Sequence, residues 1–345
     1  MLKNKTVLAF ALVIVTTLAA TFSFYLWQVA KSPNLNVDGE KAFVLYIPKG
    51  ATYDSVVDSL HEHKIIYDEI AFQFLTKWME YREKVKPGRY EILPNSGNYE
   101  IIGKLRLGAE DPVRLTFNNV RLKEDLIEKI GTKMEFDSNE LLNMLNDEKL
   151  CNEYGFSKEN IMCMFLPDTY FVYWTIAPKE FMDRMKYEYK KYWTKERLAK
   201  AAAIGMSPVE VGIMASIVQS ETNKKDEQPK VAGLYINRIQ KGIPLQADPT
   251  VKFALKDFTI KRVLNVHLSK DSPYNTYLNL GLPPGPIALP EPNALTAVLN
   301  YDKHGYVYMC AKEDFSGYHA FAVDYSTHLN NARRYQQALN ERNIK

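Results

Sequence analysis

Residues 207–222 read SPVEVGIMASIVQSET, and this stretch decides how the larger part of the chain folds. Ser207 followed three residues later by Glu210 forms a capping box, and Pro208 suits the first turn, so a helix is expected to begin here. Residues 211–218 are almost all apolar and leave no continuous polar face. We therefore expect a helix that is buried on most sides, with a folded domain built around it.

Glu221 follows at the C-terminal end of this helix, on the face that carries Met214 and Ile217. Burial and the negative end of the helix dipole both disfavour a charged carboxylate, so both raise its pKa. A carboxyl group that keeps its proton near neutral pH can protonate the leaving oxygen when a glycosidic bond breaks. The alternative is that Glu221 only pairs with Lys224 or Lys225 where the core helix ends.

The composition excludes several classes of protein. A chain of 345 residues with 46% hydrophobic and 25% charged residues is globular, with room for two modest domains. Its 44 basic and 41 acidic residues give a formal charge of only +3, which argues against a nucleic-acid binder. Cys151, Cys163 and Cys310 are too few for a disulfide framework or a four-cysteine zinc site, although one pair could oxidise outside the cytoplasm. The sequence indicates no cofactor.

Residues 7–27 read VLAFALVIVTTLAATFSFYLW and contain no charge. At about 1.5 Å per residue this run spans the roughly 30 Å hydrocarbon layer, so we predict an uncleaved transmembrane anchor. Lys3 and Lys5 precede it, so we expect the N-terminus to lie in the cytoplasm. The anchor would then cross the cell (inner) membrane once, with the rest of the chain on its extracytoplasmic side. A cleaved signal peptide is the alternative, but its apolar core would be only about 7–15 residues long.

The exported part begins with a small predicted domain of the order β-α-α-β. Alternating and helical apolar patterns predict a strand at 43–47, helices at 52–63 and 68–81, and a strand within 86–92. Phe72, Phe74 and Trp78 form an aromatic stripe that we assign to the core of this domain rather than to a sugar-binding platform.

The remainder is predicted to be mainly helical, which makes the fold class α+β. A strand at 113–117 and helices at 122–134 and 138–146 form a connecting region, followed by helices separated by proline-rich loops. The densest loop, GLPPGP at 281–286, precedes a helix for which Asn293 is the expected N-cap. A hairpin over 306–324 and a final helix capped by Ser326 or Thr327 close the chain.

Two loops after Glu221 carry side chains that both donate and accept hydrogen bonds, as sugar hydroxyl and acetamido groups require. The candidate substrate-binding residues there are Gln246, Asp248, Tyr274, Asn275, Thr276 and Tyr277. Ordinary turn chemistry is the alternative for each, with Asp248 as an Asx-type cap before Pro249. Asp168 is a further candidate, or else an N-cap.

His319 and His328 suggest a metal pair, but no carboxylate or cysteine joins them at ligand spacing. We expect them to pack within the hairpin and the last helix, and we predict no metal site. Cys163 has no catalytic context in the sequence and is expected to be a buried thiol.

Taken in order, these motifs resemble the signature of the MltG-type (YceG-like) endolytic murein transglycosylases. The resemblance is carried by ASIVQSET at 215–222, VAGLYINR at 231–238, LQADPTV at 245–251, YNTY at 274–277 and GLPPGPI at 281–287. LPDTY at 166–170 and HAF at 319–321 with His328 also fit, as does the predicted anchor. The β-α-α-β segment resembles the family's LysM-like subdomain, so the resemblance covers nearly the whole chain.

The resemblance implies that Glu221 is the catalytic acid. Many relatives have a second glutamate at the position of Gln219, which this chain lacks. A lytic transglycosylase needs only one carboxyl group, because the C6 hydroxyl of N-acetylmuramic acid attacks C1 and leaves a 1,6-anhydro end. The family also implies internal cutting of nascent peptidoglycan strands close to the membrane, with peptidoglycan synthases and division proteins as possible partners.

Two other functions fit the same residues. The first is a muramidase that hydrolyses the same bond, with Asp248 assisting the attack of water. The second is a non-catalytic peptidoglycan-binding scaffold in which Glu221 is structural. The expected organisation is a cytoplasmic N-terminus at 1–6, a transmembrane anchor at 7–29, a tether at 30–40, a LysM-like subdomain at 41–110, a connecting region at 111–149 and a catalytic domain at 150–345.

Overall fold

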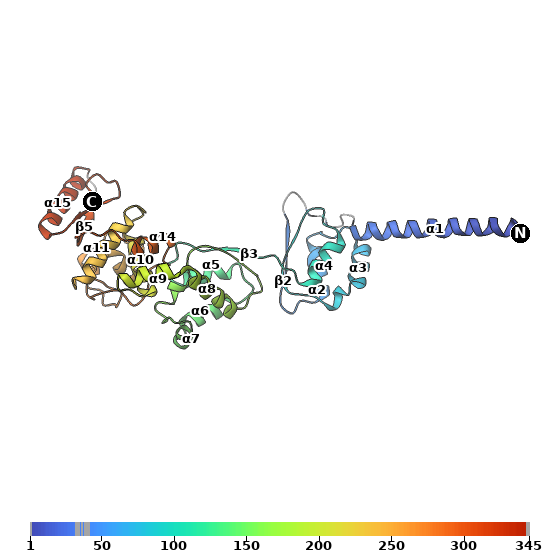
Figure 1. Ribbon diagram of the computed structural model, residues 1–345, viewed down its shortest axis with the longest axis horizontal. Coiled ribbons are helices and arrows are strands. Elements are labelled where there is room, and N and C mark those ends of the chain that lie inside the picture. Colours follow the sequence, from blue (N-terminus) through green and yellow to red (C-terminus); the bar gives the residue numbers. More distant parts are fainter. Residues whose placement is uncertain (1, 32–34, 36, 38–41, 343–345) are drawn as a thin grey trace. The chain divides into compact units, whose positions relative to one another are not determined.

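The computed structural model describes residues 2–31, 35, 37 and 42–342, so most of the predicted tether at 30–40 lies outside the described residues. The chain divides into two compact units (Figure 1). The first unit comprises residues 1–115, 133–136 and 170–176, and the second comprises residues 116–132, 137–169 and 177–345. Both helices and short strands are present, which confirms the α+β class.

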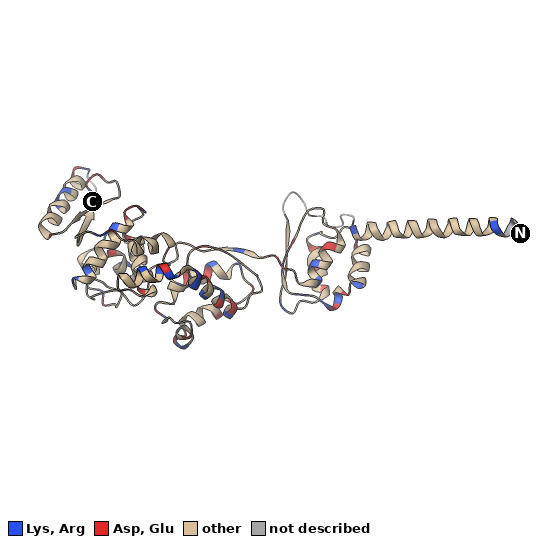
Figure 2. Cartoon of the chain, in the orientation of Figure 1, with Lys and Arg blue, Asp and Glu red and all other residues tan. Residues whose placement is uncertain are grey.

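The first unit begins with α1 (Leu2–Lys31). The most apolar 18-residue window within its segment Lys5–Lys31 has a mean hydropathy of 2.3, and none of that window is buried in the protein. Figure 2 shows that α1 carries charged residues only near its two ends. This helix is long and apolar enough to cross a membrane, as the sequence predicted. Near its end, the carbonyl oxygen of Val29 accepts a hydrogen bond of 3.3 Å from Asn98 Nδ2.

The rest of the first unit has the predicted β-α-α-β order. Its elements are β1 (Phe43–Ile47), α2 (Tyr53–Glu62), α3 (Glu69–Trp78), the 3₁₀ helix η1 (Tyr81–Glu83) and β2 (Gly88–Ile92), followed by the unpredicted α4 (Asn98–Leu107). β1 and β2 pair antiparallel, with Phe43 opposite Ile92 and Ile47 opposite Gly88. Alternate residues of both strands are buried against α2, α3 and α4, and together they form the core of the unit.

The aromatic stripe of α3 does not lie wholly in this core. Phe72 is fully buried, but Phe74 and Trp78 are 49% and 66% exposed, so their assignment to the core was wrong. On a helix of 3.6 residues per turn, Phe72 and Leu75 share the inward face, whereas positions 74 and 78 turn away from it. Phe74 and Trp78 instead line an apolar pocket with Trp27 of α1.

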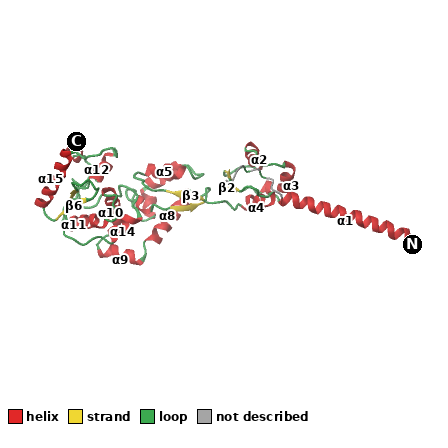
Figure 3. Ribbon diagram, turned by 90° about the horizontal axis from the view of Figure 1, so that it is seen from above, coloured by secondary structure: helices red, strands yellow, loops and turns green. Residues whose placement is uncertain are grey.

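The second unit is mostly helical, with short strands (Figure 3). β3 (Val113–Thr116) pairs with β4 (Thr169–Val172), and the division between the two units runs through both strands. The helices up to residue 221 are α5 (Lys123–Gly131), α6 (Ser138–Asn146), α7 (Glu148–Glu153), η2 (Ile161–Met164), α8 (Pro178–Tyr192), α9 (Lys195–Ala203) and α10 (Pro208–Glu221). The remaining elements are α11 (Gln228–Gln240), α12 (Asp248–Leu255), α13 (Asn265–Leu268), α14 (Pro292–Leu299), the hairpin of β5 (Tyr308–Ala311) and β6 (His319–Ala322), and α15 (Tyr325–Glu341).

The predicted buried helix is α10, at the centre of the second unit. Its capping box is formed: Ser207 Oγ accepts from Glu210 N at 3.2 Å, and Glu210 Oε2 accepts from Ser207 N at 2.7 Å. Residues 211–218 are all buried, with α9, α11, α12, α14 and η2 packed around the helix. Because it is enclosed on most sides, α10 fixes the position of the residue at its end.

Two caps differ from those predicted. α14 begins at Pro292 with Glu291 as N-cap, so Asn293 lies inside the first turn. α15 is capped by Asp324, whose Oδ1 accepts from Thr327 N at 2.9 Å, rather than by Ser326 or Thr327. In both cases the observed cap lies two or three residues before the predicted one. The three cysteines are separate thiols, and Cys163 is buried as expected.

Candidate active site

The end of α10 brings the carboxyl group of Glu221 into contact with α11. Glu221 is the last residue of α10, and its Oε1 accepts a hydrogen bond of 2.6 Å from the hydroxyl of Tyr235. The partner of Glu221 is therefore a buried tyrosine rather than Lys224 or Lys225. Glu221 lines a pocket of about 360 Å³, here called the Glu221 pocket, with Tyr235, Arg238, Gln246, Asp248 and Tyr277 among its other walls.

The surroundings raise the pKa of Glu221 to about 7. Burial is the largest cause, because it removes water from the charged form, and the negative charge of Asp248 acts in the same direction. The hydrogen bond from Tyr235 and the positive charge of Lys252 oppose this increase. A carboxyl group with a pKa near 7 exists in both protonation states at neutral pH, which suits a group that must first give and then take a proton.

Tyr235 was not identified as a site residue from the sequence. It is fully buried in α11, and burial together with the nearby charge of Glu221 raises its pKa well above the usual value, so it remains a hydrogen-bond donor. Only its place in the VAGLYINR motif signalled it. Arg238, one turn further along, donates to the carbonyl oxygens of Pro244 and Val307 at 2.8 and 2.9 Å and also to Gln246 Oε1. Arg238 thereby ties α11 to the facing loop.

Asp248 and Tyr277 also line the Glu221 pocket. Asp248 is the first residue of α12, and its Oδ1 accepts a hydrogen bond of 2.6 Å from the Tyr277 hydroxyl. The N-cap of α12 is Ala247, so the Asp248 side chain does not act as the turn cap that was the alternative. Gln246, Asp248 and Tyr277 are thus three of the sequence candidates that the fold places beside Glu221.

The remaining candidates of the YNTY loop do not line the Glu221 pocket. Asn275 is buried and donates through Nδ2 to the carbonyl oxygens of Leu268 and Lys270 at 2.9 and 2.8 Å. Thr276 is also buried and accepts from Ala247 N at 3.0 Å through its hydroxyl oxygen. The ring of Tyr274 lies against Phe253, with 4.7 Å between ring centroids. These contacts brace the loop that carries Tyr277 next to the start of α12.

Asp168 lies elsewhere in the second unit. Its Oδ1 accepts from the backbone N of Thr169 at 2.7 Å, and it lines a shallow depression with Asn118 and Glu291 rather than the Glu221 pocket. Asp168 is followed by β4 rather than by a helix, so it is not the N-cap that was the alternative to substrate contact.

The two histidines line the Glu221 pocket but have other partners. His319 Nδ1 lies 2.9 Å from Glu227 Oε2, and the ring of His328 stacks on Tyr308 at 5.2 Å. Among the residues that the structure describes, no group of three or more His, Cys, Asp or Glu side chains is placed to hold a metal ion.

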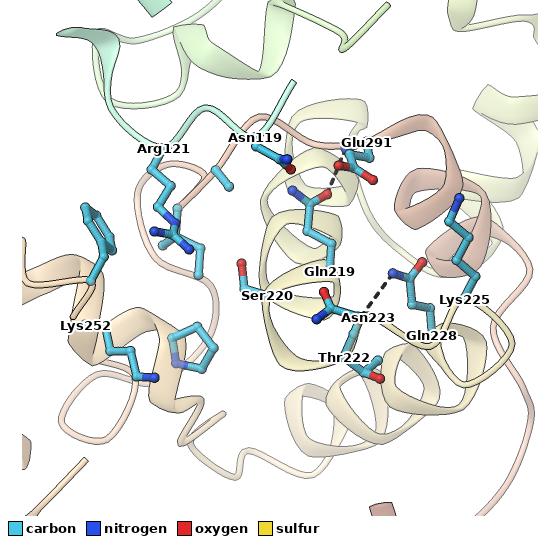
Figure 4. Close-up of a pocket in the computed structure, with 14 residues that line it drawn as sticks. Asn119, Arg121, Gln219, Ser220, Thr222, Asn223, Lys225, Gln228, Lys252 and Glu291 are labelled. Atoms are coloured by element: carbon cyan, nitrogen blue, oxygen red, sulfur yellow. Dashed lines mark hydrogen bonds between the residues drawn. The ribbon is translucent and has the colours of Figure 1, made fainter. Parts of the chain in front are cut away.

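A second pocket of about 600 Å³ lies beside the same end of α10 (Figure 4). We call it the basic pocket, because Arg121, Lys225 and Lys252 line it together with Gln219, Gln228 and Glu291. Gln219 is held on both sides of its amide: Nε2 donates to Leu289 O and Oε1 accepts from Glu291 N, each at 2.8 Å. An ionised glutamate at this position could not make the first bond.

Comparison with known proteins identifies related chains. A family model described as the YceG-like family matches residues 45–334. The endolytic murein transglycosylase of Bacillus subtilis (strain 168) is 26% identical over 323 residues, which cover 88% of each chain. The endolytic murein transglycosylase of Streptococcus pneumoniae (strain D39) is 21% identical over 307 residues, which cover 80% of this chain and 55% of the relative.

A solved structure shares the fold. The crystal structure of a yceG-like protein from Listeria monocytogenes superposes with a TM-score of 0.54 at 23% sequence identity. The match covers 85% of this chain and 99% of that chain, so an experimentally determined structure shares the fold described above.

Proposed function

This chain belongs to the YceG-like family, and from this premise we propose that it is a membrane-anchored peptidoglycan lytic transglycosylase in which Glu221 is the catalytic acid. The observation that carries the proposal is the Glu221 carboxyl group, which is held by Tyr235 at the end of a buried helix and has a pKa of about 7. The relatives named endolytic murein transglycosylase supply the class of reaction and substrate.

In the proposed reaction, protonated Glu221 gives its proton to the oxygen that links N-acetylmuramic acid to N-acetylglucosamine. The C1–O bond breaks, and the C6 hydroxyl of the same muramyl residue forms a new bond to C1. Glu221, now a carboxylate, accepts the proton released by that hydroxyl. No water is consumed, and because the attack is intramolecular, the pocket has only to hold the sugar in a reactive pose.

The remaining site residues take supporting roles in this proposal. Gln246, Asp248 and Tyr277 contact the sugar beside Glu221, because they line the same pocket. Tyr274, Asn275 and Thr276 act through the loop that they brace. Tyr235 is a positioning residue, since its hydroxyl donates to the Glu221 carboxyl group.

A hydrolytic muramidase is the second candidate. It is favoured by one observation: Asp248 lies in the Glu221 pocket and is close enough for its charge to raise the pKa of Glu221. Such a carboxylate could activate a water molecule to attack C1, and the product would then carry a reducing end instead of an anhydro ring.

We further propose that α1 anchors the protein in the cell (inner) membrane, with the N-terminus in the cytoplasm and the second unit outside. The apolar length of α1 and the lysines before its apolar core support this topology. The small domain of the first unit would serve as a LysM-like wall-binding module. Peptidoglycan synthases and division proteins are the partners that the family resemblance suggests.

The test uses the full-length chain in detergent micelles with uncrosslinked glycan strands, and the products are identified by mass spectrometry. We expect anhydro-ended fragments from the wild type and a loss of at least about 10²-fold in rate for Glu221→Gln, because the proton donor is gone. Glu196→Gln, the same change at an exposed position on α9, is the control and should retain activity. Reducing ends with one added water would establish the muramidase. If the folded wild type cleaves nothing, the catalytic proposal fails and a scaffold remains.

A further inference from the structure

The basic pocket has no role in the proton transfers described above, yet it borders the catalytic residue along the chain. Ser220 and Thr222, on either side of Glu221, line the basic pocket, whereas Glu221 itself lines the other. α12 shows the same division, with Asp248 in the Glu221 pocket and Lys252 in the basic pocket. A polymer that is cut beside Glu221 therefore meets the basic pocket within a short distance of the scissile bond.

Among the described residues, Gln228 contributes an acceptor without a partner to the lining of the basic pocket. Its side chain is only 5% exposed, and its Nε2 donates to the carbonyl oxygen of Thr222 at 3.3 Å. Within the described part of the chain, its Oε1 has no hydrogen-bond partner. Figure 4 shows this amide on the pocket wall with its nitrogen bonded toward the end of α10. A buried acceptor without a partner is unfavourable by about 1–3 kcal/mol, so the site is suited to a ligand that supplies an N–H or O–H donor.

The charges of the pocket select an anion. Arg121, Lys225 and Lys252 contribute three positive charges to the lining, against one carboxylate from Glu291. The guanidinium of Arg121 lies 4.6 Å from the centre of the Phe258 ring, which holds it on the pocket wall, and Figure 4 places Arg121 and Lys252 on the same side. Cations gathered on the wall of a polar cleft attract carboxylates.

An anion that also carries N–H donors matches one part of peptidoglycan. The sugar rings carry no charge, whereas the peptide joined to the lactyl group of each muramyl residue has free carboxylates and a series of amide N–H groups. Resting on the proposed function, we infer that the basic pocket binds this peptide on the muramyl residue beside the scissile bond. Arg121 and Lys252 receive a peptide carboxylate, and Gln228 Oε1 accepts a peptide N–H. The enzyme therefore selects strands that still carry their peptides.

The first experiment compares kcat/KM on peptide-bearing strands with kcat/KM on the same strands after an amidase has removed the peptides. For the full-length wild type we expect the ratio to favour peptide-bearing strands by roughly tenfold or more, as charge-assisted hydrogen bonds permit. Arg121→Glu should lower that ratio about tenfold, Arg121→Lys should restore part of it, and Gln228→Met should lower it without a change of charge. Lys252 is left intact because its charge also acts on Glu221.

The control is Lys241→Glu, the same reversal of charge at an exposed residue outside both pockets. It should leave the ratio within about twofold of the wild type, and circular dichroism should show that every variant is folded. A wild-type ratio near one, or an Arg121→Glu ratio equal to that of the wild type, would overturn the inference.

A second readout separates this inference from the proposed function. The inactive Glu221→Gln chain is titrated calorimetrically with a disaccharide-peptide and with the same disaccharide after amidase treatment. Tighter binding of the peptide-bearing form, lost when Arg121→Glu is added, supports the pocket even if no cleavage is seen with any substrate. If the two ligands bind with equal affinity, the inference about the basic pocket is overturned, and the assignment of Glu221 is unaffected.

Discussion

Glu221 and Tyr235 show how two side chains set the behaviour of a single proton. Burial favours the neutral acid, while the tyrosine hydroxyl stabilises the carboxylate by donating to it, and the result is a pKa of about 7. A stronger donor would ionise Glu221 before the glycosidic bond breaks. Without any donor, the carboxylate left after cleavage would lack a buried partner. The balance between burial and one hydrogen bond is therefore part of the mechanism that we propose for Glu221.

The pH dependence of the reaction tests this balance. The acid must be protonated to act, so kcat/KM should fall as the pH rises through about 7. Tyr235→Phe removes a donor to the carboxylate, which raises the pKa of Glu221 and moves this fall to higher pH. Asp248→Asn removes a negative neighbour, which lowers the pKa and moves the fall to lower pH.

Both profiles are measured from pH 5 to 9 on the strands used above. Tyr187→Phe, an exposed tyrosine on α8, is the control and should match the wild type. If the pH at which kcat/KM falls moves in the same direction for Tyr235→Phe and Asp248→Asn, the assignment of Glu221 as the titrating acid is refuted.

Among single residues, the sequence predicted the place of Glu221 in the site but not the contacts of its neighbours. The helical pattern of residues 211–218 together with the family motif pointed to Glu221, because both lie within one continuous stretch. Tyr235 lies on another helix, and its hydroxyl reaches Glu221 only once α10 and α11 pack together. Asn275 and Thr276 have the chemistry of sugar ligands, but their polar atoms are used by backbone groups of neighbouring loops, which residue type does not reveal.

Among the elements, those with strong local signals were predicted closely. α10, α6 and β1 begin and end where capping residues and apolar periodicity indicate. α4 was missed because its N-cap is Gly97, which offers no side-chain cap. Phe74 and Trp78 of α3 differ from the prediction because the aromatic pattern does not show which face of the helix packs against the core.

The GLPPGP loop allows a test of how one element positions another. Its Gly285 lies so close to the backbone of Glu159 that an added Cβ would come within 2.0 Å of the Glu159 carbonyl oxygen. A backbone atom cannot rotate away, so Gly285→Ala must displace the loop, including Ile287, whose N–H donates to Ser216 Oγ of α10 at 3.0 Å. We expect a destabilisation of about 1–3 kcal/mol, as overpacking typically causes.

Differential scanning calorimetry of the full chain measures this effect as a lower Tm for the second unit, by about 2–4 °C for each kcal/mol. The matched control is Gly103→Ala in α4, where an added Cβ would meet its nearest atom at 3.7 Å and should be neutral or slightly stabilising. An unchanged Tm for Gly285→Ala would mean that the loop adapts and does not fix the end of α10.

For the whole molecule, local patterns could not reveal that the first unit is built from three separate stretches of the chain. Residues 133–136 and 170–176 return to it after the chain has entered the second unit. Glu135 accepts from the backbone N of Lys49 at 2.5 Å, and Thr175 donates to Glu110 at 2.6 Å. Such contacts join residues far apart in sequence, and neither periodicity nor capping carries information about them.

Membrane topology is the property of the whole molecule that most directly decides where the enzyme can act. Lys5–Lys31 comprises 27 residues, which at about 1.5 Å per residue exceeds the roughly 30 Å hydrocarbon layer, and the charge before its apolar core favours a cytoplasmic N-terminus. In a Cys310→Ser background, which removes the one cysteine that is not buried, we expect a membrane-impermeant maleimide to label Lys241→Cys in intact cells but not Lys5→Cys. Permeabilisation should then expose Lys5→Cys as well. The reverse labelling pattern would place the second unit in the cytoplasm, away from the cell wall, and would contradict the proposed action on peptidoglycan.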